Sequence, residues 1–187
     1  MSKSSIKEAI DCLYICGFMA TGKSSIGSVL SQKLELPFQD LDRYLERKER
    51  TTIPKLFADK GEEYFRKKER EYLEELSSSF KGVLALGGGS LQNQAIVDRL
   101  KERGVLVYIE TPIEIIIERI MRNKNRPIAL DKQGKIKTRE TLLSELKMLY
   151  SNRKIYYNQA QIHIESDGSD CHEKMANRII EKLKLYV

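Results

Sequence analysis

The chain contains the sequence Gly17-Phe-Met-Ala-Thr-Gly22-Lys23-Ser24, which directly follows an apolar run, 13–16, and directly precedes an amphipathic stretch, 24–34. The pattern G-x-x-x-x-G-K-[ST] between a strand and a helix is typical of a phosphate-binding loop. Its glycines let successive backbone N–H groups wrap around an anion, and the following helix directs its positive dipole end at the same place. We therefore expect Lys23 to bridge the β- and γ-phosphates of a nucleotide and the Ser24 hydroxyl to bind Mg²⁺.

Apolar runs and amphipathic stretches alternate along the rest of the chain. The segments that predict strands are 13–16, 83–86, 105–109 and 162–165, with 37–40 as a further short strand candidate. The stretches that predict helices are 24–34, 41–78 with an interruption near 51–54, 91–102, 112–121, 138–157 and 171–185. This alternation predicts an α/β fold with a parallel sheet covered on both faces, whose ligands bind beyond the carboxyl ends of the strands.

Length and composition fit a single soluble globular domain, since the chain has 187 residues, of which 41% are hydrophobic and 32% charged. Residues 1–10 carry scattered charges and do not resemble a secretory signal. No stretch approaches the ~18 consecutive apolar residues that a membrane span needs. The three cysteines do not suggest a disulfide framework. We expect a cytoplasmic protein without a membrane partner.

The net charge of +6 is concentrated in one segment. Between Arg119 and Arg139 eight basic residues accompany a single acid, Asp131, so this segment carries +7 and the remainder −1. A nucleic-acid surface usually needs a longer basic stripe with aromatic or base-reading residues, and this segment contains no aromatic residue. The charge pattern therefore favours a loop that grips phosphate over a nucleic-acid partner.

Three further motifs follow predicted strands or lie on a predicted helix. In Asp40-Leu-Asp42 the two carboxylates can face one cleft, one toward Mg²⁺ and the other toward an acceptor hydroxyl, although aspartate is also favoured at helix N-termini. Arg66 and Glu69 share a helix face, where the carboxylate can brace the guanidinium for a ligand anion, although an ordinary surface ion pair is the commoner arrangement. The triple glycine 87–89 indicates a close approach of backbone to ligand.

A phosphate-binding loop alone does not distinguish a kinase from a GTPase or a hydrolytic ATPase. The base-reading Asn-Lys-x-Asp of GTPases is missing, and the nearest sequence, 123–126, has Arg126 in place of the acid. A hydrolytic ATPase needs an acid at the end of an apolar strand to position water, and Glu110 could serve. The ATPase alternative stays open on this reasoning.

Together these motifs resemble shikimate kinase over nearly the whole chain. The stretches that carry the resemblance are GFMATGKSSIG (17–27), DLD (40–42), IPKLFADKGEEYFRKKE (53–69), LALGGGS (84–90), VYIETP (107–112), NRP (125–127) and RKIYY (153–157). The resemblance implies a three-layer α/β/α P-loop kinase with a five-stranded parallel sheet in the order 2-3-1-4-5. It also implies transfer of the γ-phosphoryl group of ATP to the 3-hydroxyl of shikimate, giving 3-phosphoshikimate and ADP in the pathway to chorismate and the aromatic amino acids.

The resemblance also implies roles for individual residues. The ATP phosphates would be held by the loop residues Ala20, Thr21, Gly22, Lys23, Ser24 and Ser25. Arg119 would pack on the adenine, and Arg126 would neutralise the migrating phosphoryl group. The metal ligands would be Ser24 and Asp40. Shikimate would contact Asp42, Gly88 and Gly89, with Arg66 and Arg153 on its carboxylate. The catalytic residues would be Lys23, Asp42, as the base, and Arg126.

The family pattern further implies one domain over 1–187, acting as a monomer, with an acceptor-binding part at about 41–78 and a lid at about 122–139. The chain departs from that pattern at Ala20, where a glycine is common, and at Ile155, where a proline is usual. Two other functions stay open. A kinase for another acceptor, such as gluconate, would lack the two clamp arginines, and a nucleotide-binding protein without an acceptor would leave Asp42 and the three glycines without a role.

Overall fold

A computed structural model describes residues 6, 9–122, 128 and 135–186 of the chain. Its described part contains a five-stranded parallel sheet in the order β2-β3-β1-β4-β5. The strands are β1 (Cys12–Cys16), β2 (Phe38–Asp40), β3 (Gly82–Ala85), β4 (Val105–Glu110) and β5 (Ile162–Glu165). The strand order and the α/β class expected from the sequence are confirmed.

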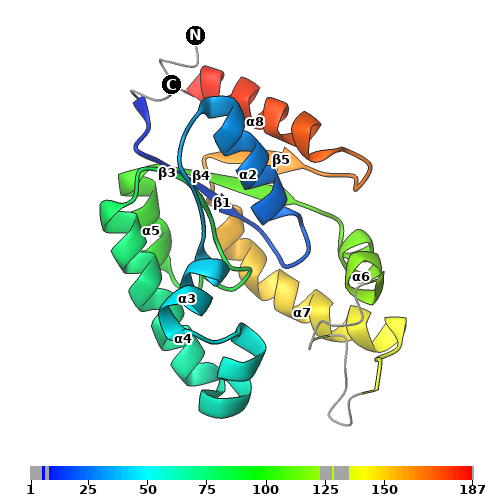
Figure 1. Ribbon diagram of the computed structural model, residues 1–187. Coiled ribbons are helices and arrows are strands. Elements are labelled where there is room, and N and C mark those ends of the chain that lie inside the picture. The colour runs from blue at the N-terminus through cyan, green and yellow to red at the C-terminus, as the bar shows by residue number, and fades with distance from the viewer. Residues whose placement is uncertain (1–5, 7–8, 123–127, 129–134, 187) are drawn as a thin grey trace.

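Helices cover both faces of this sheet, which makes three layers (Figure 1). The helices are α2 (Lys23–Leu34), α3 (Leu41–Glu49), α4 (Ile53–Ser79), α5 (Gln94–Arg103), α6 (Ile113–Arg122), α7 (Arg139–Tyr157) and α8 (His172–Tyr186). Helices α2 and α8 lie together on one face, whereas α5 and α7 lie on the other. None of the helices in the described ranges has the length and apolar composition needed to cross a membrane.

The alternation of side chains along β1 explains how one strand supports two cores. Leu13 and Ile15 join the hydrophobic cluster under α2 and α8, whereas Cys12, Tyr14 and Cys16 join the cluster under α5 and α7. Successive side chains of a strand point to opposite faces, so a central strand must be apolar at every position. All five residues of β1 are buried, as that rule requires.

Helix ends follow local capping rather than the apolar pattern alone. Helix α5 begins at Gln94 instead of 91 because the Asn93 side chain accepts a hydrogen bond from the Ile96 N–H. The expected break near 51–54 is present, with Thr52 capping α4. The structure also has a second irregularity, which was not expected from the sequence. Gly61 interrupts α4 with φ 80° and ψ 172°, a conformation that glycine adopts far more readily than other residues.

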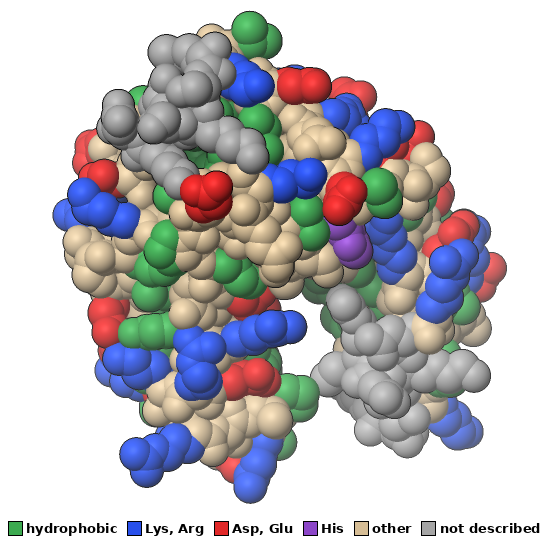
Figure 2. Space-filling view, turned by 45° about the horizontal axis from the view of Figure 1, so that its top comes forward, with side chains coloured by type: hydrophobic (Ala, Val, Ile, Leu, Met, Phe, Trp, Pro, Cys, Tyr) green, Lys and Arg blue, Asp and Glu red, His purple; other side chains and the backbone are tan. Residues whose placement is uncertain are grey.

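The topology brings three motifs to one edge of the sheet. Strands β2, β3 and β1 are parallel neighbours, and their carboxyl ends lead into residues 40–42, 87–89 and 17–22 respectively. Helix α3 and the first half of α4 project from the sheet on the same side of the molecule (Figure 1). Figure 2 shows Lys and Arg side chains gathered on this projection, beside a hollow in the surface.

Candidate active site

The phosphate-binding loop has the backbone conformation that its glycines predict. Gly17 and Gly22 have φ angles of 141° and 91°, and Gly22 is the N-cap of α2, so no side chain blocks the first N–H groups of that helix. The Lys23 Nζ donates to the Phe18 carbonyl across the loop at 2.7 Å, and the Thr21 hydroxyl donates to the same carbonyl at 2.9 Å. The loop is therefore a preformed cradle for an anion.

Ala20 also has a left-handed conformation, with φ 61°. Such a conformation costs a residue with a Cβ atom roughly 1–2 kcal/mol relative to the right-handed one. The family pattern has a glycine at this position, and the structure shows why glycine suits it.

Asp40 and Ser24 form the polar pair that the sequence assigns to the metal. The Ser24 hydroxyl donates to Asp40 Oδ2 at 2.5 Å, while Asp40 Oδ1 accepts from the Arg43 N–H at 3.0 Å. Asp40 therefore caps α3 and also contacts Ser24 at the end of the phosphate-binding loop, so the helix-cap role is confirmed and the metal role stays a prediction. A hydroxyl and a carboxylate side by side are hard oxygen donors that fit Mg²⁺.

The two arginines that the resemblance assigns to the acceptor carboxylate come from different helices and meet at one glycine. A Cβ atom added to Gly89 would lie 2.7 Å from Arg66 Nη1, on α4, and 3.2 Å from Arg153 Nη2, on α7. Both arginines line a cavity of about 780 Å³, together with Asp42, Glu62, Glu69, the glycines 87–89 and an apolar wall that includes Phe57 and Phe65. The structure thus brings together every acceptor-binding residue that the sequence predicted.

Each clamp guanidinium is held by its own partners. Arg66 Nη1 donates to Glu69 Oε2 at 2.7 Å, and Arg66 Nε donates to Glu62 at 3.3 Å. Glu69 is only 2% exposed, so this contact is not an ordinary surface ion pair. Arg153 donates to the Gly88 carbonyl at 3.0 Å and lies over the Phe18 ring, and burial lowers its pKa.

Asp42 lies in the same cavity among other carboxylates. Burial raises its pKa to about 6, and the charges of Glu69 and Asp40 act in the same direction. A Cβ atom on Gly87 would lie 2.6 Å from Glu69 Oε1 and 2.9 Å from Asp42 Oδ1. Gly87 therefore makes room for two carboxylates, a role that sequence reasoning missed although the triple glycine was noticed. A carboxyl group with this pKa is suited to accept a proton near neutral pH.

The acceptor cavity and the phosphate-binding loop touch at Gly88. A Cβ atom there would lie 3.0 Å from the Met19 backbone nitrogen, so the two segments approach as closely as backbone allows. The Tyr157 hydroxyl donates to the Gly88 carbonyl, a contact that was not predicted from the sequence. A phosphate held by the loop and a hydroxyl in the cavity would be neighbours.

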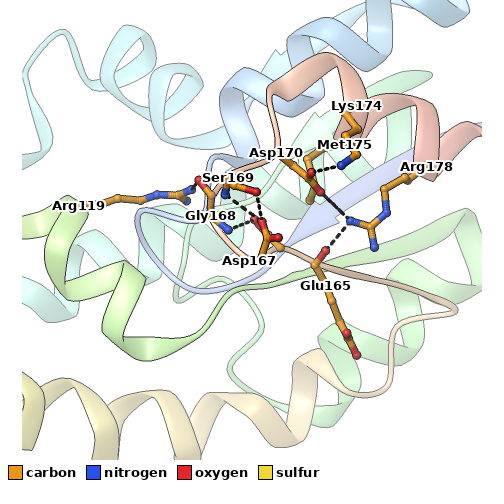
Figure 3. A network of polar contacts seen from close by, with 10 residues as sticks. Arg119, Glu165, Asp167, Gly168, Ser169, Asp170, Lys174, Met175 and Arg178 are labelled. Atoms are coloured by element: carbon orange, nitrogen blue, oxygen red, sulfur yellow. Dashed lines mark hydrogen bonds and ion pairs between the residues drawn. The ribbon is translucent and has the colours of Figure 1, made fainter.

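Arg119 connects the phosphate-binding loop to the loop after β5. Its Nη1 donates to the Ala20 carbonyl at 3.0 Å and its Nη2 to the Gly168 carbonyl at 3.5 Å. Figure 3 shows the network that fixes the second loop, in which Asp170 pairs with Lys174 at 2.6 Å and with Arg178 at 2.9 Å. Arg119 therefore borders the phosphate-binding loop at Ala20.

Arg126 and most of the lid expected at 122–139 lie outside the described residues. The roles of Arg126 and of the lid stay predictions from the sequence.

Comparison with known proteins identifies the family. The family model of shikimate kinase matches residues 19–184. The chain is 37% identical to a shikimate kinase of Aquifex aeolicus over 172 residues, 92% of this chain and 95% of the relative, and 38% identical to one of Staphylococcus haemolyticus over 156 residues, 83% and 85%. A solved shikimate kinase from Acinetobacter baumannii in complex with shikimate has a TM-score of 0.83 at 31% identity, covering 99% of this chain and 98% of that one. Motifs, geometry and relatives agree that the chain belongs to the shikimate kinase family of ATP-dependent kinases.

Proposed function

We propose that the cavity of about 780 Å³ binds shikimate, with its carboxylate on Arg66 and Arg153 and its 3-hydroxyl on Asp42. The observation that carries this assignment is the convergence of two guanidinium groups on Gly89, in a cavity that the Asp42 carboxylate also lines. A planar anion matches the fork of an arginine, and two such forks favour a carboxylate over a neutral polyol such as a sugar alcohol.

The residues divide the work of phosphoryl transfer between two neighbouring segments. The loop 17–24 holds the ATP phosphates, with Lys23 on the β- and γ-phosphates. Asp42 accepts the proton of the attacking hydroxyl, and the close contact of Gly88 with Met19 keeps the two reactants adjacent. Ser24 and Asp40 would hold Mg²⁺, whose charge offsets that of the phosphates. Arg126 would neutralise the migrating group when the lid closes, which also excludes water.

The subdivision of the chain belongs to the same proposal. Helices α3 and α4 enclose a separate small cluster of Leu45, Leu56 and Phe65, which supports an acceptor-binding part at about 41–78. The basic residues between 119 and 139 support a phosphate-gripping lid. Action as a monomer in the cytoplasm rests on the composition and on the family resemblance.

The clamp is tested by replacing each arginine with methionine, which keeps much of the side-chain volume but removes the charge. Both variants should raise the KM for shikimate by at least 100-fold and leave the KM for ATP nearly unchanged, because the lost bond is charge-assisted and partly buried. Arg70→Met, at an exposed position of the same helix α4, is the matched control. If the Arg66 and Arg153 variants keep a normal KM for shikimate, the carboxylate lies elsewhere.

A further inference from the structure

Ser90 is the residue directly after the three glycines, and the proposed reaction does not use its side chain. Its side chain is buried, with 2% of the residue exposed. Its hydroxyl donates to Glu69 Oε1 at 2.8 Å, and its backbone N–H donates to the Gly87 carbonyl at 3.2 Å, which closes the turn of the glycine segment. One short side chain therefore links the glycine segment to helix α4.

The Glu69 carboxylate is divided between two donors. Its Oε2 accepts from Arg66 Nη1 and its Oε1 accepts from the Ser90 hydroxyl. Glu69 is almost fully buried, so water cannot readily replace a lost donor, and an unsatisfied carboxylate oxygen would be costly. The Ser90 bond therefore restricts the orientation of the carboxylate that braces Arg66.

A second carboxylate makes this restraint more important. Asp42 and Glu69 both approach the position that a Cβ atom on Gly87 would occupy, and two carboxylates in one buried space repel each other. Without a donor on Oε1, the side chain of Glu69 would turn away from Asp42. That rotation would take Oε2 out of line with the Arg66 guanidinium.

We propose that Ser90 is a positioning residue for shikimate binding, which acts through Glu69 to hold the Arg66 guanidinium toward the acceptor carboxylate. The inference rests on the proposed clamp. Ser90 contacts neither ATP nor the reacting hydroxyl in this scheme, so its effect should fall on the affinity for shikimate rather than on the chemical step.

The test begins with Ser90→Ala, Ser90→Cys and Ser90→Thr. Alanine removes the donor and cysteine keeps the shape with a much weaker donor, so both should raise the KM for shikimate on the order of tenfold, with kcat and the KM for ATP within about twofold of normal. Threonine keeps the hydroxyl, so Ser90→Thr should retain most of the affinity for shikimate. Ser77→Ala is the control, because Ser77 is similarly buried but bonds within α4, to the Glu74 carbonyl. The cysteine variant decides the matter if alanine does not fold.

A double-mutant cycle distinguishes this role from a merely structural one. In an Arg66→Ala background Ser90→Ala should cause no further rise in the KM for shikimate, whereas in an Arg153→Ala background the full tenfold rise should remain. Equal rises in both backgrounds, or a parallel rise in the KM for ATP, would overturn the inference. If Arg66→Ala itself leaves the KM for shikimate unchanged, the clamp assignment fails first. If Arg66→Ala raises that KM but neither Ser90→Ala nor Ser90→Cys does, only the role of Ser90 is wrong.

Discussion

Replacing Asp42 by asparagine should make the protein more stable in neutral and alkaline solution while it abolishes most of the activity. Burial and the neighbouring charges of Glu69 and Asp40 raise the pKa of Asp42 to about 6, from an ordinary value of 3.8. The folded protein therefore holds this proton more tightly than the unfolded chain does. The protonated Asp42 carboxyl therefore makes its full contribution to the free energy of unfolding below about pH 4. This contribution is lost as the pH rises through 6.

The size of the effect follows from the two pKa values. Above pH 6 the ionised carboxyl costs roughly 3 kcal/mol of folding free energy. Asp42 lies in the first turn of α3, where a negative charge is favoured by about 0.3–1 kcal/mol, and this contribution is already contained in the net shift of the pKa. We therefore expect Asp42→Asn to be about 3 kcal/mol more stable than the parent protein at pH 8.

The assay is urea unfolding of both proteins between pH 4 and pH 8, without nucleotide or magnesium, so that ligand binding does not enter. The difference in free energy of unfolding between Asp42→Asn and the parent protein should fall toward zero as the pH falls from 8 to 4. Asp59→Asn, at an exposed position of α4, is the control for the same substitution outside the cavity. A difference that is constant with pH, or a variant less stable than the parent at pH 8, would refute this view of Asp42.

Other substitutions separate the parts of the site. Asp40→Asn keeps the cap of α3 but removes the charge beside Ser24, so its loss of kcat should become smaller as the magnesium concentration is raised. Asp42→Asn should instead lose about 10²–10⁴-fold in kcat at every magnesium concentration, because an amide cannot accept the proton of the hydroxyl. If the two respond alike in a magnesium titration, the division of labour between them is wrong. Gly89→Ala places a methyl group 2.7 Å from Arg66 Nη1 and should raise the KM for shikimate more than tenfold at a nearly normal KM for ATP. A normal KM for shikimate would place the acceptor away from Gly89.

Most of the fold could be predicted from the sequence because its signals are local. The loop 17–24 needs a strand before it and a helix after it, and the apolar runs at 13–16, 83–86 and 105–109 differ clearly from the helical stretches between them. The carboxyl ends of parallel strands meet at one edge, so the three loop motifs had to be neighbours. Helix starts were less predictable, since the position of α5 depends on one capping bond from Asn93.

The site was predicted as a set of residues but not as a network. The spacing of Arg66 and Glu69 predicts that they touch, yet only packing against the glycine segment buries Glu69 and gives it Ser90 as a second partner. Tyr157 reaches the Gly88 carbonyl only because α7 lies under β4, with its ring stacked on Tyr108. Such contacts join residues far apart in the chain, and no local pattern specifies them.

Recognition of the shikimate carboxylate by Arg66 and Arg153 can be measured without any substitution. The measurement is the rate of ADP release with shikimate and with its methyl ester, which has the same ring and hydroxyl groups but no negative charge. We predict that kcat/KM for the ester is at least 100-fold below that for the acid, because two charge-assisted contacts in a partly buried site are lost. Equal turnover of acid and ester would contradict the account.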